Sequence, residues 1–175
     1  LAIIIVILIA LLQVINVYAS SLYESYNAGD DTNNWIKSTR WSMQTFTPAD
    51  SHTITSVKLK LFRSGNPGTF TVSIRNTAAG VPDGGDLCSG TTDGNAFTTN
   101  GAGAWYTITF GAGTALTATT KYAIVMRALT GDAANYVMFR ADSSAPAYAG
   151  GNTANSDNSG GTWSAPGWDT MFEEW

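Results

Sequence analysis

Apolar and polar positions divide the chain into a short hydrophobic segment and a long mixed one. Residues 1–19 read LAIIIVILIALLQVINVYA, and only Gln13 and Asn16 interrupt the apolar run. A helix of this length would reach about 28 Å, close to the roughly 30 Å hydrocarbon core of a bilayer. The pattern therefore predicts one long N-terminal hydrophobic α-helix over residues 1–25, followed by a polar neck over residues 26–34.

Beyond the neck, short runs alternate between apolar and polar residues. The alternation is clearest over residues 53–63, 70–75 and 106–110, and it is typical of strands with one buried face. Residues 121–127 and 136–140 are more continuously apolar, as strands covered on both faces are. Further strands are expected at residues 40–46, 86–91 and 171–175.

Glycine and proline clusters separate these runs, with strong turn signals at residues 64–68, 82–85 and 93–95. Many short strands with regular turns predict a mostly β fold, a jelly-roll β-sandwich head over residues 35–175. Two segments, 76–104 and 143–168, are long and poor in apolar residues. We expect them to be functional or flexible loops.

The layout of residues 1–25 resembles that of type IV pilins, whose N-terminal helix spans the membrane before assembly and packs in the filament core afterwards. Bacterial members usually begin with an aromatic residue and carry Glu at the fifth position, where this chain has Leu1 and Ile5. Archaeal-type pilins often lack that Glu. The chain also starts without Met or basic residues, as expected after prepilin cleavage. The expected assembly residues are Ile3, Ile4, Ile7, Leu8, Leu11, Leu12, Gln13, Ile15 and Asn16.

Three other interpretations of the apolar segment stay open. It could be a secretory signal peptide, since Val17, Tyr18 and Ala19 before Ser20 resemble a cleavage site. It could be a permanent membrane anchor, or a hydrophobic donor strand shared between subunits. Strands alternate faces, whereas residues 3–12 are apolar on every face, so the helix is favoured.

The head resembles jelly-roll domains of bacterial and archaeal surface and secreted proteins. The matching stretches are QTFTPADSHTITSVKLKLFRSGNPGTFTVSIR, WYTITF, KYAIVMRA, NYVMFRAD and TMFEEW. Such domains are similar in shape to carbohydrate-binding modules. The resemblance therefore implies a β-sandwich fold, and it suggests surface glycans as partners.

Composition narrows the function further. Only 13% of residues are charged and the net charge is −4, which excludes the basic patch of a nucleic-acid-binding protein. His52 is the single histidine and Cys88 the single cysteine. No zinc spacing or phosphate-binding glycine loop is present, so we expect no enzyme and no catalytic cofactor. The Thr-, Ser-, Asn- and Gly-rich surface is common in exported proteins and predicts an extracellular location.

Carboxylates near the two ends of the head suggest one structural site. The first and last strands of a jelly roll commonly lie close together, so their acidic side chains could grip calcium. The candidate ligands are Asp30, Asp31, Glu173 and Glu174.

Aromatic residues in or beside the second long loop suggest a glycan site, because an exposed indole can stack on a sugar. The candidates are Tyr148, Trp163 and Trp168, whereas Trp41 and Trp105 flank strands and are expected in the core.

These observations predict a structural subunit of an extracellular pilus-like filament. The helices would polymerise into a homopolymer, and the β heads would face outward for adhesion. The alternative is a secreted or membrane-anchored carbohydrate-binding-like module that does not polymerise.

Overall fold

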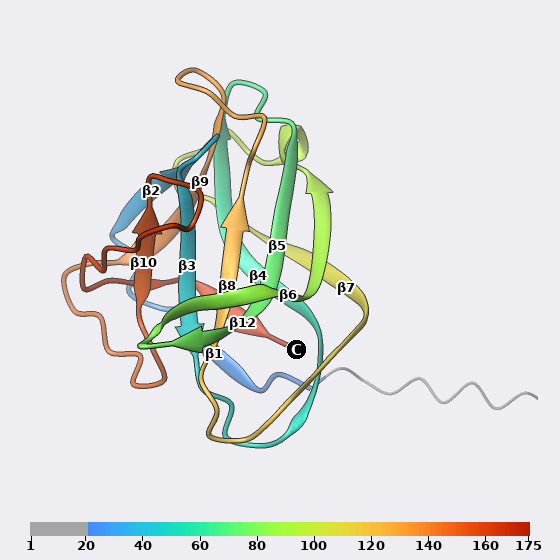
Figure 1. The fold of residues 1–175 in the computed structure, drawn as a ribbon. Helices are drawn as coiled ribbons and strands as arrows, with labels where there is room; N and C mark the ends of the chain where they lie inside the picture. Colours follow the sequence, from blue (N-terminus) through green and yellow to red (C-terminus); the bar gives the residue numbers. More distant parts are fainter. Residues whose placement is uncertain (1–20) are drawn as a thin grey trace, which may run out of the picture.

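Two antiparallel β-sheets pack face to face in the computed structural model, which describes residues 21–175 (Figure 1). The mostly β class and the β-sandwich are thereby confirmed. The expected hydrophobic helix lies outside the described residues for most of its length, and so do all nine expected assembly residues from Ile3 to Asn16.

One sheet has five strands in the spatial order β10 (Thr153–Ser156), β3 (Trp41–Phe46), β8 (Tyr122–Arg127), β5 (Thr69–Ala78) and β6 (Val81–Asp93). The seven-stranded sheet runs β1 (Glu24–Tyr26), β12 (Phe172–Glu174), β4 (His52–Ser64), β9 (Tyr136–Asp142) and β11 (Asp169–Thr170). In that sheet β7 (Ala104–Leu116) also pairs with β4, and β2 (Thr32–Ile36) pairs with β9.

The core between the sheets follows from the alternation predicted along each strand. Val57, Leu59 and Leu61 of β4 are fully buried, and every second residue of β5 and β8 meets them from the other sheet. Phe46 and Phe172 join the two sheets, with ring centroids 6.4 Å apart. Burial of each such side chain stabilises the fold by about 1.5–3 kcal/mol.

The pilin-like interpretation is wrong where the structure can be compared with it. Residues 24 and 25, expected to end the helix, and residue 26, expected to begin the neck, form β1. This strand pairs antiparallel with β12, so that Glu24 faces Glu174 across the ladder. Within residues 21–175 the only helical element is the 3₁₀ turn η1 (Gly94–Ala96), and none is long and apolar enough to cross a bilayer. The polar residues of β1 form the edge strand of a sheet. This segment therefore does not belong to an apolar helix bundle.

The expected neck also contributes a strand. Thr32 to Ile36 pair with β9, and the N–H of Asp31 donates to the carbonyl of Ala141 at 3.1 Å. Ile36 is fully buried, so this segment is part of the sandwich.

Trp105 and Trp41 do not lie in the central core, contrary to the sequence-based expectation. Trp105 is 38% exposed, because Tyr106 and Ile108 are the residues of β7 that turn inward. Trp41 is half-buried on the outer face of the five-stranded sheet.

The first long polar segment is largely β-structure. Its turn lies at Ala79 and Gly80, with φ angles of 51° and 80° as in a type I′ hairpin, and the expected turn at residues 82–85 falls inside β6. The register shifts between Ile74 and Asn76, so residues 84–87 bulge out of the ladder. Beyond the bulge, the arm formed by residues 76–83 crosses in front of β3 and β8 (Figure 1).

Candidate functional site

A second, smaller apolar cluster lies on the outer face of the five-stranded sheet. Met43 of β3 and Val125 of β8 are buried there, together with Ala123 and Ala154. Val81 of the hairpin arm and Trp163 pack against them. The continuously apolar sequence of residues 121–127 predicted a strand covered on both faces, and these two segments provide the outer cover.

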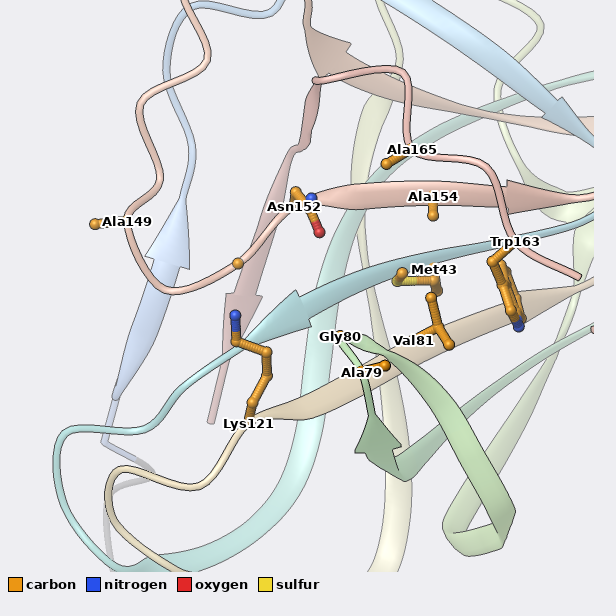
Figure 2. Close-up of a pocket in the computed structure, with 11 residues that line it drawn as sticks. Met43, Ala79, Gly80, Val81, Lys121, Ala149, Asn152, Ala154, Trp163 and Ala165 are labelled. Carbon is orange, nitrogen blue, oxygen red and sulfur yellow. The ribbon is translucent and has the colours of Figure 1, made fainter.

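The cover is incomplete and leaves a hollow of about 320 Å³ (Figure 2). Met43 and Ala154 form its floor, and the hairpin tip and Trp163 form its walls. Small side chains leave the space open. The complete lining is Met43, Ala79, Gly80, Val81, Lys121, Ala149, Gly151, Asn152, Ala154, Trp163 and Ala165.

A tightly bonded loop places Trp163. The carboxamide oxygen of Asn158 accepts from the N–H of Thr162 at 2.8 Å, and the hydroxyl of Ser156 accepts from the N–H of Gly160 at 2.8 Å. Gly160 has φ +86°, and a Cβ there would lie 3.2 Å from the indole of Trp41. Only glycine fits this approach without strain, so the loop holds Trp163 beside Trp41.

The neighbouring part of this sheet face carries two arginines that share one aspartate. Arg75 and Arg127 lie over the Trp41 ring, with Cζ 5.7 Å and 5.3 Å from its centroid. Both donate to Asp86 in the β6 bulge, at 2.7 Å and 2.6 Å. Burial opposes ionisation of Asp86, but the two guanidinium groups hold its pKa below the usual value. These two cations are therefore already occupied within the protein.

The structure separates the three aromatic residues singled out in the sequence. Trp163 lines the hollow, whereas Tyr148 and Trp168 pack against the central core. The hydroxyl of Tyr148 donates to Glu24 at 3.1 Å, and its ring meets Phe172 edge-on at 5.1 Å. Burial, followed by the charge of Glu24, raises the pKa of Tyr148. Its role here is to hold β1 to the sandwich.

Asp30 and Asp31, two of the four expected calcium ligands, both bind protein donors. Asp30 accepts from Lys60 at 3.0 Å and from Arg140 at 2.9 Å. Burial opposes its ionisation, but these two cations keep its pKa below the usual value. Hydrogen bonds from Ser144 and Ser143 lower the pKa of Asp31 to about 2. The pair anchors the segment between β1 and β2.

The other two expected ligands, Glu173 and Glu174, lie in β12 with different partners. Glu173 is 3.4 Å from Lys58, and the fully buried Glu174 is 2.6 Å from Nε2 of His52. The ring of Tyr23 stacks on His52, with centroids 3.6 Å apart. Across residues 21–175, no three His, Cys, Asp or Glu side chains cluster as metal ligands do. Structural calcium stays a prediction.

The sequence did not identify the other residues that line the hollow. Lys121 precedes β8, Asn152 precedes β10, and residues 79–81 form the tip of the hairpin arm. No periodic signal marks them, because they meet only once the arm folds over the sheet. The one usable sequence signal was the doubly covered β8.

No protein-family model matches the chain, and no curated protein is significantly similar to it. The resemblance to type IV pilins and to surface jelly-roll domains is therefore not supported by any family match. The volume and lining of the hollow are the features that bear on function.

The hollow is suited to reversible binding. Its volume lies at the lower end of the roughly 300–1,000 Å³ usual for ligand pockets. An indole, an apolar floor, one amide and one ammonium group line it. Such a lining matches a small ligand that has one apolar face and several hydrogen-bonding groups.

Proposed function

We propose that the protein is a non-catalytic, extracellular carbohydrate-binding module that holds one or two sugar rings in the hollow beside Trp163. The observation that carries the proposal is the placement of a half-buried tryptophan at the wall of a hollow on an outer sheet face. A pyranose ring presents C–H groups on one face and hydroxyls around its rim. An indole and an apolar floor complement the face, and a few polar groups complement the rim.

Asn152 provides one of those polar groups. Its carboxamide oxygen accepts weakly from the hydroxyl of Thr45 at 3.4 Å. Its Nδ2 donor has no hydrogen-bond partner within residues 21–175, so it is available to a ligand hydroxyl. The N–H of Thr45 donates to the carbonyl of Asn152 at 3.0 Å, and the N–H of Asn152 donates to the hydroxyl of Thr45 at 2.9 Å, so the position of this residue near the end of β3 is fixed.

The extracellular location and the jelly-roll topology are predictions from the sequence. The composition suits display outside the cell, where glycans are abundant. The jelly-roll path of the strands is the finer form of the sandwich and stays a prediction.

Trp163→Ala should weaken binding about tenfold, because stacking and burial of the indole supply part of the affinity. The full chain would first be screened against neutral and acidic oligosaccharides on an array. Isothermal titration with the best oligosaccharide then compares the variant with the native chain.

Trp105→Ala is the matched control, since Trp105 is an exposed tryptophan of the other sheet. It should leave the affinity unchanged. Equal losses in both variants, or none in Trp163→Ala, would show that the hollow is not the sugar site.

A further inference from the structure

The charge on the lining of the hollow is unbalanced. Lys121 is its only charged residue, and neither an aspartate nor a glutamate contributes to it. We propose that the hollow selects sugars that carry a carboxylate, namely uronic acids, and that Lys121 is the residue that recognises this group. The inference rests on the proposed carbohydrate-binding function and specifies its ligand class.

Lys121 differs from the other cations of the described chain, residues 21–175. Six of the other eight pair with a carboxylate: Arg40, Lys58, Lys60, Arg75, Arg127 and Arg140. Lys37 lies over the rings of Trp35 and Tyr136, and Arg63 donates to the carbonyls of Phe97 and Gly65. Within the same residues, the ammonium group of Lys121 has no such partner.

The fold also fixes where Lys121 stands. Its carbonyl accepts from the hydroxyl of Thr77 at 2.9 Å, which ties the start of β8 to the hairpin arm. The next residue, Tyr122, pairs with Asn76 in the ladder. Figure 2 shows the side chain extending from this point at the edge of the hollow. The backbone of Lys121 is therefore fixed at the mouth, and its exposed side chain is free to turn toward a ligand beside the indole.

A single carboxylate fits this site better than a phosphate or sulfate ester. Phosphate and sulfate esters present three terminal oxygens and are usually bound by several donors, such as arginine forks or consecutive backbone amides. Here the charged and amide donors are one ammonium group and the amide of Asn152, and the other lining residues are alanine, glycine, methionine, valine and tryptophan. One positive charge on an apolar wall matches one negative charge on a sugar ring.

The test compares short oligomers of galacturonic, glucuronic and mannuronic acid with their methyl esters. Esterification removes the charge but keeps the ring and its hydroxyls. With the full chain at low salt, the best acid should bind about five- to tenfold more tightly than its ester, as expected for a partly exposed ion pair. The preference should shrink as salt is raised, because exposed charges are screened.

Lys121→Gln should abolish the preference and leave the affinity for the ester unchanged, whereas Lys121→Arg should retain it. Trp163→Ala should weaken acid and ester alike. If the ester binds as tightly as the acid, or if Lys121→Gln keeps the preference, the inference is overturned while carbohydrate binding stands. If neither acids, esters nor neutral sugars bind, the proposed function fails as well.

Discussion

Gln44→Leu should lower the free energy of unfolding by about 2–4 kcal/mol, measured by urea denaturation at pH 7. Gln44 is fully buried in β3, and its carboxamide oxygen accepts from the hydroxyl of Thr153 and the N–H of Thr170, both at 2.8 Å. Its amide nitrogen, Nε2, donates to the carbonyl of Thr45 at 3.0 Å. Leucine preserves the volume but leaves the buried N–H of Thr170 unpaired.

The loss should be large because Gln44 connects the two sheets. Thr153 lies in β10 of the five-stranded sheet and Thr170 in β11 of the other. Ser42→Ala is the control, since Ser42 is equally buried in β3 but bonds only to Asn155 within its own sheet. We expect it to cost about 1 kcal/mol. Equal costs for the two variants would contradict a special role for the inter-sheet bond.

Stability should fall as pH rises above 4.5, the ordinary pKa of a glutamate, and Glu174→Gln should remove much of this fall. Burial raises the pKa of Glu174, although the bond to His52 opposes the shift. The folded chain therefore holds a proton that the unfolded chain has released. The unfolding free energy then declines with pH until Glu174 ionises in the folded state as well, by at most about 1.4 kcal/mol per pH unit for one proton.

The hydrogen-bond geometry explains why this proton matters. Nδ1 of His52 lies 2.9 Å from the carbonyl of Asp50, so it must carry a hydrogen. Nε2 is 2.6 Å from Oε1 of Glu174, whereas Oε2 is buried and has no hydrogen-bond partner in the described residues. Ionisation of Glu174 in the folded chain would leave negative charge on this unpaired oxygen.

Glutamine can replace the protonated acid, because its uncharged side-chain amide has both a donor and an acceptor to offer to Nε2 of His52. Urea denaturation of both chains between pH 4.5 and 8 should therefore give a flatter profile for Glu174→Gln. Glu173→Gln is the control, since Glu173 precedes Glu174 in β12 and lies 3.4 Å from Lys58 of β4. This variant should have the same pH profile as the native chain. Parallel profiles for native and Glu174→Gln would place the proton elsewhere.

Strand positions could be predicted where one face is buried. The alternation over residues 53–63 gave β4 to within one residue at each end, and residues 121–127 gave β8. Strands that pair through polar residues had no such signal. β1 was expected mostly in the helix, β2 mostly in the neck and β10 in a loop, because ladder hydrogen bonds, which any residue except proline can make, hold these strands in place.

The site could be predicted only in part, for a related reason. Trp163 was singled out as a tryptophan in a long loop, but Met43, Lys121 and Asn152 come from separate segments. Their meeting depends on the β6 bulge and the turn at Ala79 and Gly80. The glycine-rich 82–85 sequence predicted a turn, yet Pro82 and Asp83 pair with β5, and Gly84 and Gly85 lie in the bulge. The direction of the arm is thus a tertiary property that local sequence does not encode.

The attachment of β1 has a mechanical consequence. This strand has three residues, whereas the following segment is anchored by the ion pairs of Asp30 and the serine bonds of Asp31. Tension applied at residue 21 would load the short ladder first and peel it from β12 before the Asp30 and Asp31 anchor bears the force. Residues 24–29 would then extend by up to about 20 Å. Such staged extension would absorb part of an applied pull before the Asp30 and Asp31 anchor and the rest of the sandwich are loaded.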